Sequence, residues 1–513
     1  MISIFDGKIV PNNCKLVGYT WLISYFELTL PVRKLSCISE KRLSLKRKER
    51  EEWIIFDSQI SYDESVGGHL EFAIKHEFLD LLLIKRVIDC LDPKEITTFI
   101  KSNLKGIYRR KIWFYYEFFR NEKLEIEDLP VGKYENLMNE KDYFTNTNII
   151  KSKRHKINNN LLGAASFCPV IRRTKKLNTF IKKGLSQKSK NIVGKISPEI
   201  LRRAASFLLL ADSKASFEIE GERPPKSRIE RWGKIINEAG RYELSIGEIE
   251  RLHAALIHNT KLLKIGLRED GVFVGERDRE GDPLPEFIGA REEDLEKLMK
   301  SWVGLNKILA KSDIDSILYT TIMAFSFVFI HPLEDGNGRI HRYLLHHVLG
   351  RQKFYPADII FPISSVILNE IEKYREVLIA HSGPLMDCIE WKTTEKKNVK
   401  VTNKTIDLYR YFDCTTASEF IYECAEKTIE ELLPKEINYL ESFDKSFKEA
   451  KDFIEMPDHK LKQLLTFIIH NGGKLSDRKK KRYFKDLPED IQIDVEEIIS
   501  ENFDVSEGIR LLE

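Results

Sequence analysis

The chain has 513 residues, of which 42% are apolar and 32% charged, and its formal net charge is +3. These values suit a globular protein with more than one core, and the near balance of charge gives no overall reason to expect a polyanionic partner. No unbroken apolar run approaches the ~20 residues that a membrane-spanning helix needs. The start, Met-Ile-Ser-Ile-Phe-Asp, lacks the pattern of a signal peptide. Seven widely spaced cysteines without a C-x-x-C pair indicate reduced thiols. We therefore expect a cytoplasmic protein with no membrane association.

Residues 1–190 carry no recognisable chemistry. Residues 21–26 and 53–56 are apolar enough to be buried, as strand or as helix. Helical spacing over 69–91 and 107–119 predicts a mostly helical N-terminal domain. Basic runs between 151 and 183 fit contact with nucleic acid or acidic protein, but solvated surfaces explain them more simply.

A helix is predicted to begin at Ser197. Serine is a favoured N-cap, Pro198 suits the first helical position, and Glu199 lies in the first turn. The helix leads into Ser216 and Glu220, which are four residues apart and are expected to share a helix face.

The next segments predict a helix, a hairpin and two more helices. Residues 246–260 have helical apolar spacing. In 267–289, two short apolar segments flank a polar connection rich in Gly, Asp and Pro, which predicts a β-hairpin. Residues 290–309 and 314–330 then read as helices, the second of them buried.

Twelve residues from His331 to Arg342, sequence HPLEDGNGRIHR, follow that buried helix and precede another helical pattern, which Gly350 is expected to close. A helix N-terminus offers unpaired N–H groups and positive potential, which favour phosphate. Gly336 and Gly338 allow backbone angles that turn successive amides toward one centre. Arg339 and Arg342 are neighbours on the first turn, where two guanidinium groups can grip a polyphosphate.

Two further groups complete this predicted site. Asp335 is placed to hold a divalent cation that bridges phosphates. His331, at the other end of the loop, can accept a proton from an attacking hydroxyl.

The stretch resembles the signature of the Fic family, His-x-Phe-x-Asp/Glu-Gly-Asn-Gly-Arg-x-x-Arg, and differs at one fixed position, where Leu333 replaces Phe. The resemblance implies an all-helical nucleotidyltransferase that moves AMP from ATP to a protein hydroxyl with Mg²⁺. His331 would be the general base and Asp335 the metal ligand. The nucleotide-binding residues would be Gly336, Asn337, Gly338, Arg339, Ile340, His341 and Arg342, with Tyr374 against the adenine or ribose. Tyr374 is otherwise a core aromatic.

The resemblance also assigns two regulatory or binding segments. Residues 216–221 resemble the family's inhibitory motif, Ser/Thr-x-x-x-Glu-Gly/Asn, whose Glu pairs with the second signature arginine; here Glu220 would pair with Arg342. Residues 267–289 resemble the family's flap, whose edge pairs with the target's backbone. The flap residues expected to bind the target are Val272, Phe273, Val274, Phe287 and Ile288.

Beyond the signature, residues 364–378 predict a helix, and residues 409–440 another that Pro434 is expected to break. In 458–503, apolar residues at helical spacing precede Asn471-Gly472-Gly473 and a basic run, 478–482. This pattern predicts a small helical or winged-helix-like module, for which nucleic acid is a weakly supported partner.

The predicted fold is mainly α: a Fic-type helical bundle with a short β-hairpin flap, an N-terminal domain and a small C-terminal module. The expected segments are 1–190, a catalytic core of 191–400 with inhibitory segment 197–221 and flap 267–289, a connector of 401–455, and 456–513.

The leading functional prediction is an adenylyltransferase that modifies a Ser, Thr or Tyr hydroxyl of another protein or of itself and is autoinhibited by Glu220. Removal of AMP by the same site, with Glu220 aligning a water, is a second reading. A nucleotide-sensing, DNA-associated regulator is a third. Transfer of UMP, GMP, phosphate or phosphocholine also stays open, and the resemblance is compatible with a homodimer.

Overall fold

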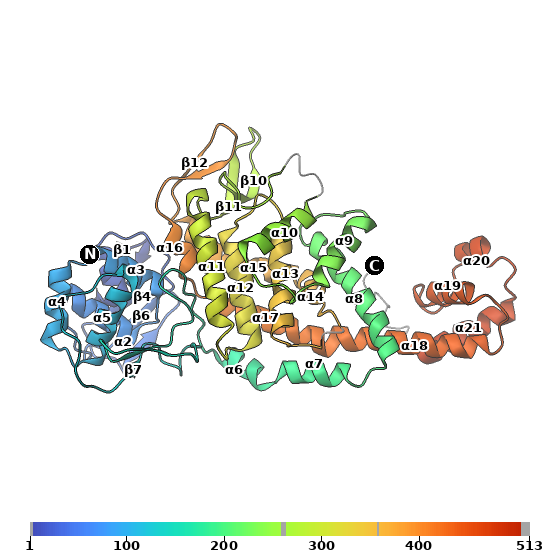
Figure 1. Ribbon diagram of the computed structural model, residues 1–513, viewed down its shortest axis with the longest axis horizontal. Coiled ribbons are helices and arrows are strands. Elements are labelled where there is room, and N and C mark those ends of the chain that lie inside the picture. The colour runs from blue at the N-terminus through green and yellow to red at the C-terminus, as the bar shows by residue number, and fades with distance from the viewer. Residues whose placement is uncertain (1–3, 258–262, 357–358, 504–513) are drawn as a thin grey trace. The chain divides into compact units, whose positions relative to one another are not determined.

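The computed structural model describes residues 4–257, 263–356 and 359–503, and the chain forms two compact units (Figure 1). The first contains residues 1–179, 242–348 and 372–421, and the second contains residues 180–241, 349–371 and 422–513. This division groups the predicted catalytic loop with the N-terminal region, and the predicted inhibitory helix with the C-terminal region. In the described part of the chain, each helix is too short or too polar to cross a lipid bilayer.

The N-terminal region of the first unit is a mixed structure, so the expectation of a mostly helical domain is wrong. A four-stranded sheet has the order β3-β4-β6-β5, with β4 and β6 parallel. Every residue of β4 and β6 is buried, and the continuous apolar run of β6 cannot be told from a buried helix by periodicity. The strands are β3 (Cys14–Leu16), β4 (Leu35–Ser39), β5 (Arg47–Glu49) and β6 (Trp53–Phe56).

Five helices accompany this sheet, and two small sheets complete the region. The helices are α1 (Gly18–Tyr25), α2 (Val66–His76), α3 (Leu81–Cys90), α4 (Pro93–Ser102) and α5 (Ile107–Arg120). The small sheets are β1 (Ile4–Phe5) with β2 (Lys8–Ile9), and β7 (Glu135–Asn136), β8 (Ile150–Ser152) and β9 (Ile157–Asn159) in the order β7-β9-β8. Helix α6 (Lys175–Lys182) follows.

A helical bundle around α12 (Ser316–Ile330) forms the rest of the first unit. Asp315 caps the start of α12 by accepting hydrogen bonds from the amides of Ile317 and Leu318, and residues 317–330 are all buried. A helix that is apolar on all sides belongs at the centre of a bundle. Figure 1 shows α12 beside α11 (Leu295–Leu309), and the Trp302 indole donates to the Met323 carbonyl oxygen at 3.0 Å. The other elements are α10 (Ile246–Leu256), η1 (Glu292–Asp294), α13 (Asn337–Arg351), α15 (Ile371–Met386), α16 (Ile406–Arg410) and α17 (Thr415–Lys427).

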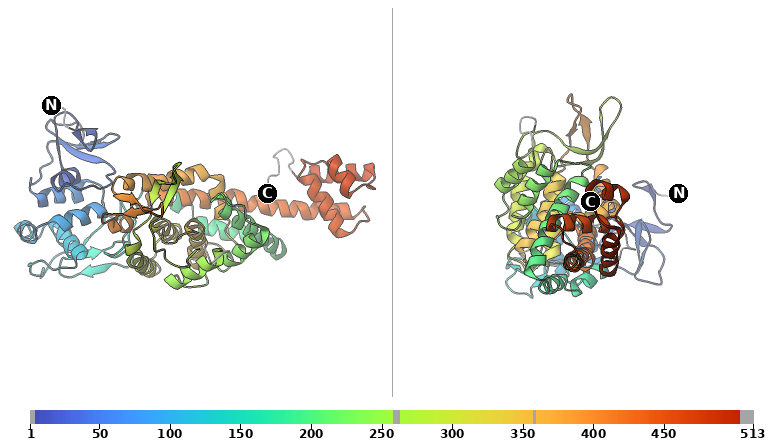
Figure 2. Two further views of the ribbon diagram at one scale, coloured as in Figure 1. Left: turned by 90° about the horizontal axis from the view of Figure 1, so that it is seen from above. Right: turned by 90° about the vertical axis from the view of Figure 1, so that its right-hand side faces the viewer.

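Two β-hairpins project from these helices (Figure 2, right). The predicted hairpin is present: β10 (Phe273–Arg277) pairs with β11 (Pro283–Ile288) in antiparallel register. The second, β12 (Trp391–Thr393) with β13 (Val399–Val401), was not predicted, because three-residue strands are too short to give a pattern.

The second unit is helical in its described residues. Ser197 caps α8 as predicted, accepting from the Ile200 amide, and Asp212 on α8 caps α14 by accepting from the amides of Ser364 and Ser365 at 2.7 and 3.2 Å. The helices are α7 (Leu185–Val193), α8 (Pro198–Glu218), α9 (Lys226–Ile236), α14 (Ile363–Asn369), η2 (Thr428–Leu432), α18 (Leu433–Lys451), α19 (Asp458–Ile469), α20 (Asp477–Tyr483) and α21 (Glu489–Asn502).

Three predicted helix boundaries are wrong. The helix expected over 364–378 is two helices, because the chain turns at Glu370 between α14 and α15. Pro434 does not break the helical path: the π-turn η2 precedes it, and Pro434 occupies the first turn of α18, where no N–H is needed. Gly350 does not close the helix after the signature, because α13 continues to Arg351.

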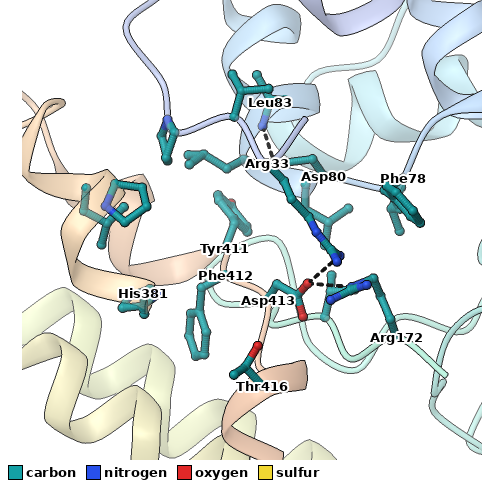
Figure 3. A pocket seen from close by; sticks show the side chains of 18 of the residues that line it. Arg33, Phe78, Asp80, Leu83, Arg172, His381, Tyr411, Phe412, Asp413 and Thr416 are labelled. Atoms are coloured by element: carbon teal, nitrogen blue, oxygen red, sulfur yellow. Dashed lines mark hydrogen bonds and ion pairs between the residues drawn. The ribbon is translucent and has the colours of Figure 1, made fainter. Parts of the chain in front are cut away.

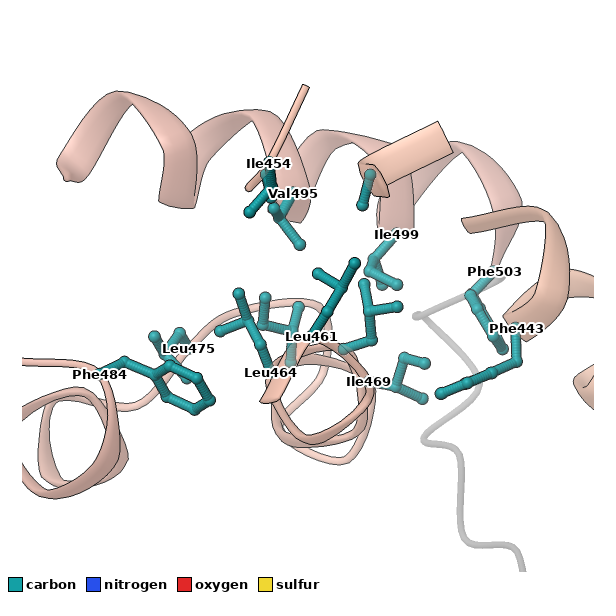
Figure 4. Close-up of a cluster of buried hydrophobic side chains, with 13 residues drawn as sticks. Phe443, Ile454, Leu461, Leu464, Ile469, Leu475, Phe484, Val495, Ile499 and Phe503 are labelled. Atoms are coloured by element: carbon teal, nitrogen blue, oxygen red, sulfur yellow. The ribbon is translucent and has the colours of Figure 1, made fainter. Parts of the chain in front are cut away.

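The C-terminal helices α19, α20 and α21 pack with α18 around one apolar core (Figure 4). Leu461, Leu464 and Leu465 of α19 meet Val495 and Ile499 of α21 in this core. The described residues of the segment contain no strand, so the module is helical and has no wing.

Candidate active site

His331 is the residue at which α12 ends. Its backbone is left-handed, with φ 54° and ψ 59°, and its N–H donates to the Phe327 carbonyl oxygen at 3.0 Å. Its Nδ1 lies 3.1 Å from the Val328 carbonyl oxygen. Because a carbonyl oxygen can only accept, Nδ1 carries the proton, and Nε2 is the basic nitrogen of the neutral ring.

The loop after His331 is held in shape by Asn337. The Asn337 side-chain oxygen accepts from the Leu333 amide at 3.0 Å, and its nitrogen donates to the Leu333 carbonyl oxygen at 2.8 Å. Leu333 itself is fully buried, so leucine fills the anchoring position. Of the two glycines, Gly336 has a left-handed backbone (φ 86°), whereas Gly338 lies in the first turn of α13.

The N-terminus of α13 faces this loop, and two buried arginines lie on its first turns. Arg339 and Arg342 are each 1% exposed. One guanidinium nitrogen of Arg339 lies 2.8 Å from both carboxylate oxygens of Asp335, whose side chain is 47% exposed. Helix N–H groups and buried cations together favour an anion at this end of α13.

The other residues predicted to bind nucleotide pack inside the bundle. Ile340 and His341 are fully buried, and the His341 Nδ1 donates to the Ala324 carbonyl oxygen at 2.9 Å. The Tyr374 ring is 4% exposed and stacks at 6.0 Å on His341 and at 5.9 Å on Phe420. Tyr374 therefore contacts one residue of the signature, His341. Its contact with a nucleotide stays a prediction.

The base of the flap touches His331. The Phe287 ring stands edge-on to the His331 ring with centroids 5.9 Å apart. At Gly289, a Cβ atom would come within 2.9 Å of the His331 Cβ and 2.7 Å of a Val272 methyl, so this position has room for glycine alone. Ile288 is fully buried, whereas Val274 is 46% exposed. Target binding by these flap residues stays a prediction.

Arg268 joins the flap to the loop and was not predicted. Its Nε donates to the His331 carbonyl oxygen at 2.8 Å, and its terminal nitrogens donate to the carbonyl oxygens of Asp270, at 2.7 Å, and Ala290. Burial lowers the pKa of Arg268 to about 10, so it stays charged at neutral pH. Its position just before the hairpin is the only sign of this role in the sequence. A charged residue at such a position is normally expected to face solvent.

His253 of α10 also lies next to the signature loop, and the sequence analysis did not predict a role for it. Its Nδ1 accepts from the Gly266 amide at 3.1 Å, and its ring lies next to Gly336. Burial lowers the pKa of His253, against the smaller opposing effect of the Asp335 carboxylate, so the ring is neutral. Its place on the apolar face of α10 gave no sign of this role.

The second hairpin lies against the flap. The Asn398 side chain donates to the Gly271 carbonyl oxygen at 2.7 Å. Lys396 and Lys397 pair with Asp270 and Asp282 at 2.9 and 2.7 Å. The flap is therefore braced at its base and near its turn.

The predicted inhibitory residues lie at the end of α8 in the second unit. Ser216 is 1% exposed in the last turn of α8, and Glu220 is exposed in the turn that follows. The Glu220 N–H donates to the Phe217 carbonyl oxygen at 3.0 Å, and Gly221 leaves the turn with φ 72°. The predicted pairing of Glu220 with Arg342 stays a prediction.

Metal ligands are sparse in the described residues, which contain no cluster of three His, Cys, Asp or Glu side chains able to hold a metal ion. Asp335 is nevertheless a half-exposed carboxylate at the predicted phosphate site. This fits Mg²⁺, which is commonly held by one or two carboxylates together with substrate phosphates.

The site therefore consists of a histidine beside a glycine-containing loop that leads into the N-terminus of a helix with two buried arginines. Comparison with known proteins points the same way: residues 243–349 match the model of the Fic/DOC family. A protein named protein adenylyltransferase fic-1 from Caenorhabditis briggsae is 28% identical over 153 residues, which cover 29% of this chain and 27% of that protein. One named protein adenylyltransferase Fic from Nematostella vectensis is 28% identical over 193 residues, covering 37% of this chain and 38% of that protein.

Among solved structures, a Fic family protein from Desulfovibrio desulfuricans aligns with 18% identity and a TM-score of 0.38, over 60% of this chain and 87% of the other. The chain therefore spans about a quarter of the length of the first relative and less than two fifths of the length of the second. Residues 243–349 are a Fic domain.

Proposed function

We propose that this protein is a protein adenylyltransferase, which transfers AMP from ATP to a hydroxyl side chain of a target protein or of itself. The observation that carries the proposal is the hydrogen bond from the His331 Nδ1 to the Val328 carbonyl oxygen. It fixes the tautomer in which Nε2 is basic, at the entrance of a loop that leads into a helix N-terminus. The names of the two relatives that match 153 and 193 residues of this chain support the same reaction.

The chemistry needs one base and a site for phosphate charge. His331 Nε2 takes the proton of the target hydroxyl while the hydroxyl oxygen forms a bond to the α-phosphorus of ATP. The bond from that phosphorus to the bridging oxygen breaks, and pyrophosphate leaves. The N–H groups of α13 with Arg339 and Arg342 stabilise the phosphate charge, because positioning and electrostatics dominate such transfers.

Asp335 would hold Mg²⁺, which would neutralise charge on the phosphates. In this structure the Asp335 carboxylate is the ion-pair partner of Arg339. A metal bound at Asp335 would weaken that ion pair, and the Arg339 guanidinium would then be able to bond phosphate oxygens.

The flap would present the target and Glu220 would restrain the reaction. The flap base contacts His331 through Phe287 and Gly289, so a target strand paired with the flap would carry its hydroxyl toward Nε2. The Glu220 carboxylate would pair with Arg342 and so would compete with a nucleotide phosphate for the same cation.

Incubation of the protein with α-labelled ATP and Mg²⁺ tests this function. A candidate target lysate is included, and transfer is measured as covalent label on protein. Label is expected with the parent or the activated Glu220→Gly form and is expected to be lost in His331→Ala. The matched control is His459→Ala, which removes an exposed histidine from α19. Label retained in His331→Ala would remove His331 from the base role. Label from γ-labelled ATP in place of α-labelled ATP would indicate phosphate transfer.

A further inference from the structure

A cavity of about 440 Å³ lies inside the first unit, away from the signature loop (Figure 3). Its walls come from the segment before β4, from the stretch that starts α3, from α12 and α15, and from the turn between α16 and α17. A volume of this size is in the range of pockets that hold small organic ligands.

One side of the cavity brings two arginines to a single carboxylate. Arg172 and Arg33 both approach the carboxylate of Asp413, with N–O distances of 2.8 and 3.7 Å. The same two guanidinium groups lie over the Phe78 ring, at 5.7 and 5.0 Å from its centre. Burial and the neighbouring Arg172 cation lower the pKa of Arg33. Two cations thus share one anion at a partly enclosed position, where a second anion would be stabilised.

The two other acidic groups on this wall, Glu77 and Asp80, differ in charge at neutral pH. Burial raises the pKa of Glu77 to about 8, so this carboxyl is protonated at neutral pH. Its oxygens are already engaged by the Tyr19 amide at 3.0 Å and the Ser36 hydroxyl at 2.7 Å. Burial raises the pKa of Asp80 to about 6, so this carboxylate is still ionised at neutral pH; it caps α3 by accepting from the Leu83 amide at 2.9 Å.

The opposite side is apolar and aromatic. Phe329 and Phe412 meet edge to face at 5.4 Å, and Phe329 stacks on His381 at 3.6 Å. Val377 and Leu408 extend this side. Burial lowers the pKa of His381 to about 3, so the ring is neutral. Its buried Nε2 has no hydrogen-bond partner in the part of the chain that the structure describes.

We propose that this cavity binds a small organic monoanion, with the carboxylate of the ligand at Arg33 and Arg172 and an aromatic or branched apolar body against Phe329 and Phe412. The pairing of a cationic side with an apolar side selects an amphipathic ligand, because a bare anion would leave the aromatic side in contact with water and a neutral ligand would add no charge for the two arginines that share Asp413. The site is separate from the adenylyltransferase site, so the inference stands whether or not the proposed reaction is correct.

Calorimetric titration of the full chain tests this inference. The probes are 3-phenylpropanoate and 4-methylpentanoate, each compared with its neutral amide, and acetate. We expect saturable binding of one carboxylate or both, at least tenfold weaker binding of the amides, and none of acetate. Absence of binding by both carboxylates at millimolar concentrations would overturn the proposal, as would equal binding of acid and amide.

Two variants assign the site. Arg33→Gln is expected to weaken binding tenfold or more; the Arg33 side chain is 48% exposed, so the fold should tolerate the change. Arg50→Gln, an exposed arginine outside the cavity lining, is the matched control and should bind like the parent. Ala417→Leu, which adds volume inside the cavity, should also weaken binding without a change of charge. Unchanged affinity in both Arg33→Gln and Ala417→Leu would overturn the proposal even if the probes bind.

Discussion

Arg268 donates its Nε–H to the carbonyl oxygen of His331 at 2.8 Å. The base proposed for catalysis is therefore held by a side chain that lies just before the first strand of the flap. The same guanidinium donates to the carbonyl oxygens of Asp270 and Ala290, which begin and end the flap segment. One buried guanidinium group therefore forms hydrogen bonds with both the flap segment and the catalytic loop.

Arg268→Met is expected to cost about 2–4 kcal/mol of unfolding free energy, because one buried and two partly buried carbonyl oxygens lose a charged donor. Covalent labelling, measured well below the melting temperature, should fall at the same time, since His331 is no longer held. Arg268→Lys should recover part of the stability, because one ammonium group cannot reach all three carbonyls. The control is Arg279→Met, an exposed arginine at the flap turn. Full activity in a folded Arg268→Met protein would contradict the positioning role.

Gly289→Ala should reduce labelling at least tenfold. The added Cβ would lie 2.9 Å from the His331 Cβ and 2.7 Å from a Val272 methyl, so the flap base or the histidine must shift. Such overpacking costs about 1–3 kcal/mol of unfolding free energy. Gly247→Ala on α10 is the control, because its Cβ would meet one atom, the Ser245 hydroxyl oxygen, at 3.9 Å. Equal activity of the two variants would show that the close approach at Gly289 does not matter.

The parts of the site that the sequence predicted are those built from neighbouring residues. The loop from His331 to Arg342 is contiguous, so its glycines, its arginines and the start of the helix lie next to one another in the sequence. The flap hairpin was also predictable, because both strands and their polar connection lie within 23 residues, 267–289.

The parts that escaped prediction depend on contacts between distant residues. Arg268 is buried because His331 and Ala290 supply carbonyl acceptors, and no local pattern separates such an arginine from a solvated one. Strand β6, residues 53–56, was ambiguous because burial on both faces removes alternation. Pro434 was misjudged because it lies in the first turn of α18, where proline is tolerated.

Glu220→Gly and Glu220→Gln are expected to raise covalent labelling about tenfold or more over the parent. Both remove the carboxylate that is proposed to compete with phosphate for Arg342, and a coupling of about 1.4 kcal/mol corresponds to a factor of ten. Glu218→Gln is the matched control, because Glu218 lies two residues earlier and pairs with Lys214 at 3.7 Å. The assay uses α-labelled ATP at a concentration below saturation. Equal labelling of parent and Glu220 variants would refute autoinhibition, and faster loss of AMP from a pre-modified target would favour the hydrolytic reading.

Glu77→Gln should make the protein more stable than the parent at pH 8 and leave a smaller difference at pH 5. Burial raises the pKa of Glu77 from 4.5 to about 8, so the folded state keeps a proton that the unfolded chain has released. That contribution to stability is complete below about pH 4.5 and is lost as the pH rises toward 8. Each unit of pKa shift corresponds to about 1.4 kcal/mol, so the loss amounts to at most about 5 kcal/mol. Glutamine cannot ionise, yet its oxygen can accept from the Tyr19 amide and its nitrogen can donate to the Ser36 hydroxyl.

Denaturant titrations of parent and Glu77→Gln at pH 5, 6.5 and 8 measure this effect. Glu122→Gln is the control, because the Glu122 side chain is 62% exposed and its substitution should give the same small change at each pH. The gain of Glu77→Gln over the parent should grow from pH 5 to pH 8, since only the parent ionises a buried carboxyl over that interval. A gain that stays constant with pH, or a variant less stable than the parent at pH 8, would mean that Glu77 is ionised in the folded protein.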